Sequence, residues 1–354
     1  MSFRKMIGLA ISLWITSICS AEPIESLEVR RQFDFWSGEW DVTNRFWAAD
    51  RGEAVIPGAA LRVYPILSGG ALVEHYRGAN WGGNDIFGFS VRAYDPEKEK
   101  WVILLNWPSG NARFWTMEGG FEFNRGLFYG ERQGQDSETI TDRYIFSDLI
   151  PGFYRWEGSQ STDNGVTWNR PGYVMEGTRR TTDAEQIDTA WLHGDPITDR
   201  CEGEQRRELD FMQGEWEGRT RIRDASGAWS ELDCRIESRA ILANCARMNL
   251  YEHDLPESDE PYGAFTVLAY DADREAWVSY FVNSDGPSAG AMHRYEGKRH
   301  ENGISMSREL DSGNIERFRW HDIQPDSYRW EQARSTDGGE SWTVEVATEF
   351  ERVQ

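Results

Sequence analysis

The chain repeats itself, and this duplication limits its possible folds more than any other feature. Residues 33–40 (FDFWSGEW) match residues 209–216 (LDFMQGEW) at a shift of 176 positions (216 − 40). Residues 161–168 match residues 335–342 at a shift of 174 positions (342 − 168). Small loop deletions between the two motifs produce a drift of this size. We therefore infer two similar domains in tandem.

Each copy has the pattern of a β-domain. Short apolar or alternating runs are separated by turn signals about every 8 to 12 residues. Only 24–36 and 204–212 look helical, each just before a Gly-x-Trp motif. A unit of about 150 residues with one short helix and many strands favours a closed barrel, because closure removes exposed strand edges. In the first copy the expected strands are 87–94, 101–107, 113–118, 127–132, 139–146 and 154–159, with turns at positions such as Glu118-Gly119-Gly120.

The N-terminal segment has the features of a secretory signal peptide. Arg4 and Lys5 precede an apolar run that is too short to span a bilayer, and Cys19-Ser20-Ala21 offers a small-residue cleavage site. A lipoprotein would instead carry its lipid on Cys19, which Ile18 before it disfavours. We therefore expect a mature protein in the periplasm or outside the cell. No later run is apolar enough to span a bilayer, so we expect no membrane insertion.

The charge balance restricts the partners of the protein. The 38 Lys and Arg residues face 60 Asp and Glu residues, which gives a net charge of −22. Nucleic acids and anionic membrane surfaces both require clustered basic residues, so neither is an expected partner. The apolar content of 39% is high enough for packed cores and excludes wholesale disorder.

A Gly-x-Trp motif opens the first expected strand of each copy, as Gly38-Glu39-Trp40 and Gly214-Glu215-Trp216. With the FDFW run at 33–36, Tyr94-Asp95-Pro96 and a late Ser-x-Asp-x-Gly, the chain resembles a large group of uncharacterised secreted bacterial lipocalin-like proteins, once per copy. The resemblance implies an all-β fold of two tandem lipocalin-like antiparallel β-barrels, each preceded by a short helix. It implies small-molecule binding only loosely, because a fold does not determine a function.

The same resemblance assigns a structural role to the motif tryptophans. In lipocalin-like barrels this Trp closes one end, and an Arg from the last strand stacks on its ring. Arg179 or Arg180 would do so in the first copy and Arg352 in the second. The expected segments are a signal peptide at 1–21, barrel one at 22–180, a polar, acidic linker at 181–200 and barrel two at 201–354.

A second motif, Ser-x-Asp-x-Gly-x-x-Trp, ends each copy and looks like the Asp-box of sialidase propellers. A propeller needs four or more copies at blade spacing, and this chain has two copies 174 positions apart (342 − 168). We therefore expect a hairpin in which the Asp accepts hydrogen bonds from the turn, Gly adopts positive φ and Trp packs beneath. These structural residues are Asp163, Gly165, Trp168, Asp337, Gly339 and Trp342.

Three cysteines remain after the signal peptide, and all lie in the second copy. A hairpin turning near 242–244 would place Cys245 opposite a residue near Ala240, away from Cys234. We predict a Cys201–Cys245 disulfide and a free Cys234. Three scattered cysteines without a C-x-x-C spacing indicate no metal site, and the acidic loop at 252–261 lacks the EF-hand pattern. We expect no cofactor.

No known catalytic motif is present, so the candidate site comes from barrel geometry. Alternation along 72–77 places Glu74 and Tyr76 inside barrel one. A buried Glu needs a partner, for which we consider Arg113, Arg132, Arg143 and Arg155. At a shift of 176, Trp107 becomes Asn283 and Trp115 becomes Ala291, which suggests that barrel one kept a site that barrel two lost. The candidate ligand-binding residues are Glu74, Tyr76, Asn106, Trp107, Arg113, Trp115, Arg132 and Arg143.

The favoured function is binding of a small, partly apolar molecule, mainly in barrel one, with barrel two structural or packed on its twin. Two alternatives stay open. One is an isomerase or hydrolase in the barrel lumen that uses Glu74 as base and an Arg as anion stabiliser. The other is a protein-interaction module without a ligand. An open cavity beside Glu74 would favour the enzyme, and a filled interior would favour the interaction module.

Overall fold

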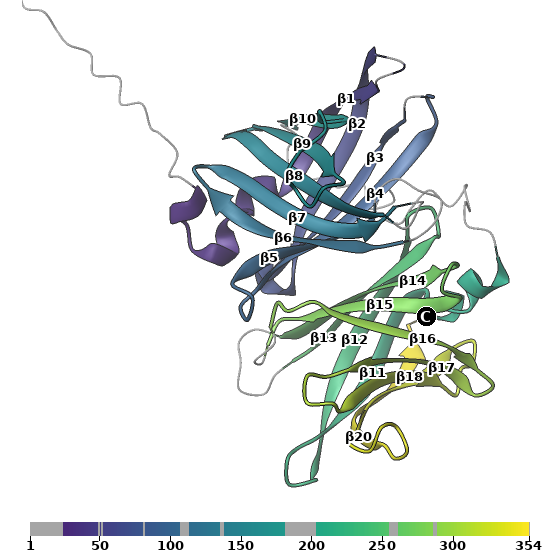
Figure 1. Cartoon of the computed structure of the whole chain (residues 1–354). Coiled ribbons are helices and arrows are strands. Elements are labelled where there is room, and N and C mark those ends of the chain that lie inside the picture. The colour runs from purple at the N-terminus through teal and green to yellow at the C-terminus, as the bar shows by residue number, and fades with distance from the viewer. Residues whose placement is uncertain are drawn as a thin grey trace, which may run out of the picture.

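The computed structural model describes residues 24–48, 50, 52–80, 82–106, 113–134, 138–180, 203–254, 261–285 and 289–353. These residues form two closed antiparallel barrels of ten strands each (Figure 1). Consecutive strands pair with each other, and the first strand of each barrel pairs with the last. This confirms the expected all-β fold with two tandem barrels. The expected signal peptide and linker lie outside the described residues.

The strand bounds repeat between the two barrels. Barrel one consists of β1 (Gly38–Ala48), β2 (Gly52–Ile66), β3 (Ala71–Ala79), β4 (Asp85–Asp95), β5 (Lys100–Asn106), β6 (Trp115–Glu122), β7 (Arg125–Gln133), β8 (Thr139–Ile150), β9 (Phe153–Ser161) and β10 (Tyr173–Arg179). Barrel two consists of β11 (Gly214–Arg223), β12 (Trp229–Ile241), β13 (Ala246–His253), β14 (Tyr262–Asp271), β15 (Ala276–Asn283), β16 (His293–His300), β17 (Gly303–Glu309), β18 (Ile315–His321), β19 (Ser327–Ser335) and β20 (Thr343–Arg352).

The expected helices are short 3₁₀ turns that plug one end of each barrel. None of the helical segments in the described part of the chain is long and apolar enough to cross a bilayer. The turns before barrel one are η1 (Ile24–Ser26), η2 (Val29–Arg31) and η3 (Asp34–Trp36), those before barrel two are η6 (Glu204–Arg207) and η7 (Asp210–Met212), and η4 (Leu67–Gly69) lies between β2 and β3.

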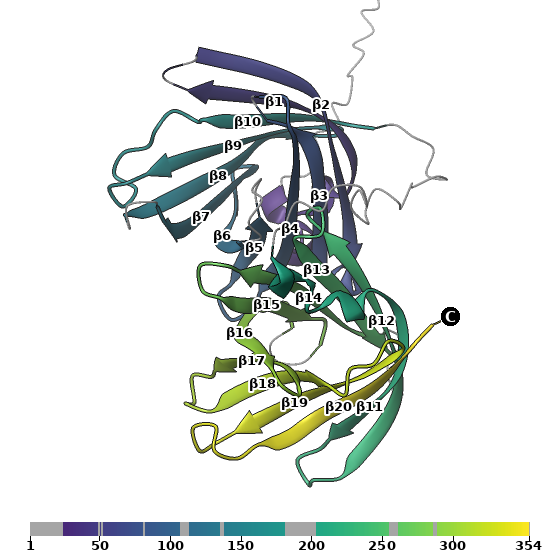
Figure 2. The ribbon, with the colours of Figure 1, turned by 90° about the vertical axis from the view of Figure 1, so that its right-hand side faces the viewer.

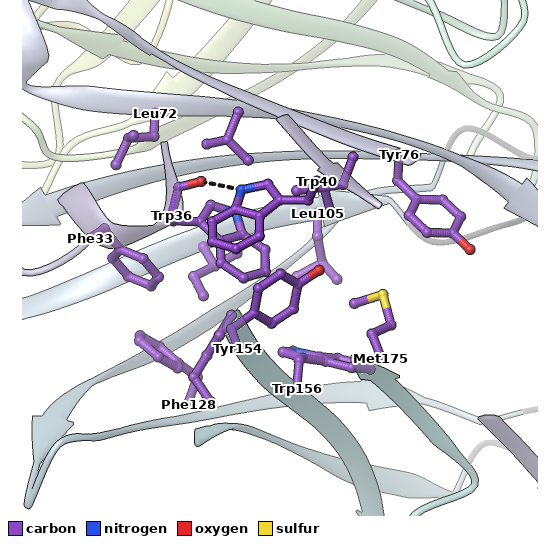
Figure 3. Close-up of a cluster of buried hydrophobic side chains, with 14 of the residues drawn as sticks. Phe33, Trp36, Trp40, Leu72, Tyr76, Leu105, Phe128, Tyr154, Trp156 and Met175 are labelled. Atoms are coloured by element: carbon purple, nitrogen blue, oxygen red, sulfur yellow. Dashed lines mark hydrogen bonds between the residues drawn. The ribbon is translucent and has the colours of Figure 1, made fainter. Parts of the chain in front are cut away.

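The closed end of barrel one is held by Trp40 and Arg179. The Trp40 indole donates a hydrogen bond of 2.9 Å to the Trp36 carbonyl (Figure 3). The Arg179 guanidinium lies 4.3 Å from the centroid of the Trp40 ring and donates to the Phe35 carbonyl at 2.6 Å. Gly38 has a φ of +123°, and a side chain there would overlap the guanidinium. Of the two candidates, Arg179 is therefore the residue that stacks.

Barrel two closes in the same way with Trp216 and Arg352. The Trp216 indole donates to the Met212 carbonyl at 2.7 Å. Arg352 lies 4.1 Å from the centroid of the Trp216 ring and donates to the carbonyls of Phe211 and Pro325, each at 3.0 Å. Gly214 has the matching φ of +114°. The plug and its stacked arginine are therefore the shared frame of the two barrels.

The late motif forms the hairpin between β9 and β10. Asp163 accepts hydrogen bonds from the side chain of Thr167 at 2.6 Å and from its backbone N–H at 2.8 Å. These bonds, with one from Ser161, lower the pKa of Asp163 from 3.8 to about 2. Arg143 lies 4.1 Å from the centroid of the Trp168 ring beside this hairpin. Barrel two repeats the arrangement with Asp337, Ser341, Gly339 and the pair Arg317–Trp342, at 3.9 Å.

The two barrels share a hydrophobic cluster in addition to their own cores. The outer faces of β3, β4 and β5 pack against those of β13, β14 and β15 (Figure 2). The central strands β5 and β15 are buried on both faces, so their sequences are apolar runs instead of alternating patterns. Barrel two therefore packs on its twin. The cluster joins Ile66, Leu67, Val73, Phe89, Val91, Leu104 and Phe114 to Ile241, Leu242, Phe265, Val267, Val278, Tyr280 and Val282.

The cysteine geometry agrees with the predicted hairpin. Cys234 pairs with His253 at one end of the β12–β13 ladder, whereas Cys245 lies in the turn at its other end. Cys234 is buried and free, and burial raises the pKa of its thiol. Cys201 lies outside the described residues, so the Cys201–Cys245 disulfide stays a prediction.

Candidate functional site

A buried ion pair occupies the lumen of barrel one. Glu74 on β3 faces inward, and its Oε2 atom lies 2.5 Å from Arg92 Nη2. The same oxygen accepts hydrogen bonds from Ser90 Oγ at 2.9 Å and Trp36 Nε1 at 3.3 Å. The expected partner is corrected by this geometry. Glu74 pairs across the sheet with Ser90, and Arg92 follows two positions later on the same inward face of β4.

Aromatic side chains fill the rest of that lumen (Figure 3). Phe33, Trp36, Phe128 and Tyr154 are almost completely inaccessible to solvent. The cavity left beside Glu74 has a volume of about 30 Å³. This space is far below that of ordinary ligand pockets, which begin at about 300 Å³. Glu74 therefore has no room beside it for a substrate.

Two other predicted residues, Tyr76 and Asn106, also lie near this lumen. Tyr76 accepts a hydrogen bond from Asn44 Nδ2 at 2.6 Å and packs in the core. Asn106 lines the small cavity with Glu74, and its Nδ2 donates to the Arg113 carbonyl at 2.7 Å. Trp107 lies outside the described residues. The structure therefore brings Glu74 and Asn106 together without an open pocket.

Arg113, Trp115 and Arg132 lie instead in a cleft of about 690 Å³ between the barrels. Arg132 pairs with Asp142 at 2.7 Å, and Arg113 forms an ion pair with Asp273 of barrel two. Because these charges are already compensated, they offer little to a charged ligand. Barrel two contributes Asp271, Asp273, Arg274, Val278, Tyr280 and Arg294 to this cleft.

Arg143 corrects another expectation. Asp142 and Tyr144 on either side of it line the cleft at the mouth of barrel one, so Arg143 points to the opposite face of β8. There it stacks on Trp168. Arg143 therefore belongs to the late hairpin and not to a ligand pocket.

Barrel two holds an open cavity of about 330 Å³ in its lumen. The strand registers show why. At three lumen positions barrel two carries the smaller side chain: Met212 for Trp36, Val346 for Tyr173 and Thr348 for Met175. The lining residues are Thr220, Ile222, Ile236, Asn249, Tyr251, His253, Tyr262, Ala264, Thr266, Phe281, Asp285, Phe318, Trp320, Tyr328, Trp330, Gln332, Val346 and Phe350.

Asn249 occupies the position that Glu74 has in barrel one. Asn249 pairs with Thr266 as Glu74 pairs with Ser90. Its side chain is only 4% exposed, and no described residue bonds to its Oδ1 atom. Two of the three donors that satisfy Glu74 have no equivalent here, because Leu268 stands in place of Arg92 and Met212 in place of Trp36. The third, Ser90, is replaced by Thr266, which does not bond to the Asn249 oxygen. The Asn249 amide thus lines the cavity with an unused acceptor.

The other polar groups differ between the two ends of the cavity. Those near the mouth are hydrogen-bonded to each other, whereas the Tyr328 hydroxyl at the closed end is bonded to no described residue. Near the mouth, Tyr251 Oη lies 2.7 Å from Thr220 Oγ1 and 3.0 Å from His253 Nδ1. Burial lowers the pKa of His253 below 6.5, so this imidazole is neutral at pH 7. At the closed end, Tyr328 packs on Trp216 with ring centroids 4.7 Å apart. The Tyr328 hydroxyl is buried without a partner among the described residues.

Sequence reasoning missed another buried carboxylate, Glu316 on β18. It accepts hydrogen bonds from Tyr295 at 2.5 Å, Arg308 at 2.8 Å and Gln332 at 2.7 Å. Burial alone would raise the pKa of Glu316, but the Tyr295 hydrogen bond and the Arg308 charge outweigh it and hold the pKa below its ordinary value. Glu316 is therefore ionised and satisfied, which suits a structural role. Within the described part of the chain, no group of three or more His, Cys, Asp and Glu residues could hold a metal ion.

Comparisons with known proteins assign the chain to no family. No protein-family model matches the chain, and no curated protein matches it. The chain is similar to a Nostoc punctiforme protein of unknown function from the DUF3598 family, at 10% identity over 92% of this chain and 100% of that one, with a TM-score of 0.27. It is also similar to the S-type phycobiliprotein lyase of Guillardia theta, at 13% identity over 43% of this chain and 99% of that one, with a TM-score of 0.31.

A third similar structure is the Rv2717c protein of M. tuberculosis, at 10% identity over 43% of this chain and 99% of that one, with a TM-score of 0.31. The two closed barrels fit a tandem lipocalin-like fold. Lipocalins close with eight strands, whereas each barrel here has ten. Because barrel diameter grows with strand number, ten strands leave more lumen to be filled or kept open.

The absence of Trp107 and Trp115 from the second copy pointed to barrel one, but aromatic rings fill the lumen of that barrel. The informative signal was the opposite one, namely smaller side chains in the second copy, such as Met212 for Trp36. A single fixed shift between the two copies also gives the wrong counterpart of Trp115. The β5–β6 register makes His293 the counterpart of Trp115, and Ala291 is not. Asn249 could be found only after the strands had been paired.

Proposed function

We propose that the protein binds a small, partly apolar molecule in the lumen of barrel two. The observation that carries this proposal is the cavity of about 330 Å³ with a buried, unpartnered amide in its wall. This volume lies at the lower end of the range of small-molecule sites, and the lining combines aromatic walls with few polar groups. The proposal moves the expected site from barrel one to barrel two.

Barrel one supports neither of the other two hypotheses well. An enzyme using Glu74 would need space for a substrate beside the carboxylate, and Arg92, Ser90 and Trp36 already occupy its hydrogen bonds. An interaction module would use both barrels as filled bodies, whereas barrel two is not filled. We propose that barrel one is a packed support on which barrel two rests through the shared cluster.

We also propose that the protein is exported. The basic residues and apolar run of 1–21 support export to the periplasm or beyond. N-terminal sequencing of the mature protein should then begin at Glu22.

Native mass spectrometry of the full-length protein, purified from its own host, tests the binding function. We expect an added mass on the wild type. Val346→Tyr places the barrel-one side chain in the barrel-two cavity and should abolish the added mass. The reverse change Tyr173→Val in barrel one is the matched control and should leave it intact.

Absence of any added mass from the wild type would overturn the proposal, as would an added mass that Val346→Tyr leaves unchanged. Near-UV circular dichroism shows whether Val346→Tyr still folds. Ala264→Leu is a second filling substitution on a different strand and should have the same effect if Val346→Tyr does not fold.

A further inference from the structure

The charge of the cavity wall limits the ligand. Among the described residues that line the cavity of barrel two there is no Lys or Arg, and the one carboxylate is Asp285 at the mouth. His253 is neutral at pH 7 because burial lowers its pKa. A charged group carried to the floor of this cavity would lose its hydration without gaining a counter-charge. The wall therefore favours an uncharged molecule.

Aromatic rings give the cavity its shape. Phe318 lies at the centre of a group of rings, 5.5 Å from Phe281 and 5.3 Å from Trp330 between centroids. These residues come from β15, β18 and β19, so the rings line one side of the barrel. Ring faces and edges pack best against another flat ring. A planar ligand body fits this wall.

The inward-facing polar side chains of β13 follow a defined order from the closed end of the barrel to its mouth. Arg247 lies at the closed end, outside the cavity lining, where it donates to the plug residue Asp210 at 3.1 Å. Tyr251 and His253 bond to each other near the mouth. Between them, Asn249 has an unused Oδ1 atom. Tyr328, on the closed side of β19, has an unused hydroxyl.

A hydroxyl group has the hydrogen-bonding capacity that both atoms need, because it donates one hydrogen bond and accepts others. It would donate to Asn249 Oδ1 and accept from the Tyr328 hydroxyl. A carboxylate or a ketone can only accept, so it would leave the Asn249 oxygen unpaired. A ligand that displaces solvent from these atoms must replace the hydrogen bonds that it breaks.

We propose that barrel two selects an uncharged, planar aromatic molecule whose buried end carries a hydroxyl group, held between Asn249 and Tyr328. This inference rests on the proposed function and names its ligand class. It predicts that the hydroxyl contributes about tenfold or more to affinity, since two hydrogen bonds to buried groups depend on it.

Equilibrium dialysis of the full-length protein tests the class with three matched probes: 2-naphthol, 2-methylnaphthalene and 2-naphthoate. We expect 2-naphthol to bind about tenfold or more tightly than the isosteric 2-methylnaphthalene, with 2-naphthoate the weakest. Asn249→Leu and Tyr328→Phe should each remove most of this preference while leaving 2-methylnaphthalene binding nearly unchanged. Tyr154→Phe, the same change at the matched position of barrel one, is the control and should leave the affinity for all three probes unchanged.

Asn249→Leu also has a readout without ligand. Replacing an unpartnered buried amide by an apolar side chain should not lower the urea midpoint of the free protein. A lowered midpoint would show that the amide is used within the protein, and would overturn the inference.

The outcomes separate the two proposals. Equal affinity for 2-naphthol and 2-methylnaphthalene, or tightest binding of 2-naphthoate, overturns the ligand class while barrel-two binding stands. Failure of all three probes to bind also overturns the class. The proposed function is then decided by the added mass in native mass spectrometry, which uses no probe.

Discussion

The two barrels have the same frame and opposite interiors. Both close with a 3₁₀ plug, a buried Trp and a stacked Arg. At one matched position, however, barrel one has Glu74 with three donors and barrel two has Asn249 with a free acceptor. The difference shows that a barrel lumen is either packed or kept open by a few side chains, while the strands and the plug stay the same.

The filled interior of barrel one has a structural consequence. An ion pair buried among aromatic rings is rigid only while all its members remain, because each charge depends on the other. The outer face of the same barrel carries β3, β4 and β5, which form half of the cluster between the barrels. A filled barrel one therefore provides a stable wall on which the open barrel two packs.

Among the differences between the two interiors, loss of Arg92 should have the largest effect on the free energy of unfolding. Arg92→Leu installs the barrel-two residue and leaves the Glu74 carboxylate buried without its counter-charge. We expect a loss of about 3–5 kcal/mol in the free energy of unfolding, measured by urea denaturation at pH 7. The double variant Glu74→Asn with Arg92→Leu copies barrel two at both positions and should lose much less, because no charge is left unpaired.

The single and double variants together show whether the loss of stability comes from the unpaired charge of Glu74. If the double variant is as unstable as Arg92→Leu alone, the cost comes from packing of the Arg92 side chain against Phe33 and Trp36, and the ion-pair argument fails. The urea dependence should keep the same slope in both variants, since the surface exposed on unfolding does not change.

Much of the fold could be predicted from the sequence because local signals were strong. The alternating runs at 139–146 and 154–159 lie within β8 and β9. The expected turn at Glu118-Gly119-Gly120 was wrong, since it lies inside β6 and the chain turns at Phe123 and Asn124. Gly119 is required there by packing, because a side chain would overlap the Leu127 carbonyl on β7.

The site could not be predicted in the same way, because a cavity is a difference between side chains that are distant in sequence. Met212 and Val346 open the lumen together, and neither signals this alone. The partner of Glu74 was also missed, since Arg92 becomes adjacent only when β3 and β4 are in register. The shared cluster concealed the alternation that would have shown which faces of β4 and β5 point inward.

A smaller effect sharpens the likeness of the closed ends. Arg179→Met and Arg352→Met each remove a cation from an indole face and hydrogen bonds from carbonyls of the plug. We expect each to cost about 2 kcal/mol in urea unfolding. Arg352→Met should cost slightly more, since Arg352 also donates to the Pro325 carbonyl.

The neighbouring Arg180 provides the control for that prediction. It is more than a third exposed and pairs with Asp41 on the surface at 2.7 Å. Arg180→Met should therefore change the free energy of unfolding by less than about 1 kcal/mol. An equal loss for Arg180→Met and Arg179→Met would mean that the stack on Trp40 does not hold the closed end.

The smallest expected effect concerns the late hairpins, which differ in one hydroxyl donor, Thr167 in the first and Ser341 in the second. Hydrogen bonds from Thr167 and Ser161 lower the pKa of Asp163 from 3.8 to about 2, and those of Ser341 and Ser335 lower the pKa of Asp337 further. Because both folded pKa values are depressed, each carboxylate stabilises its hairpin above pH 4 and loses that contribution as the pH falls through its folded pKa. Both side chains are exposed to solvent, so the effect on overall stability should be slight.

A carboxyl-detected NMR titration should find both resonances titrating well below 3.8, with Asp337 the lower of the two. Titration of either carboxyl near 3.8 would show that its hairpin bonds are not kept in solution, and the two barrels would then differ at their open ends as well as in their interiors.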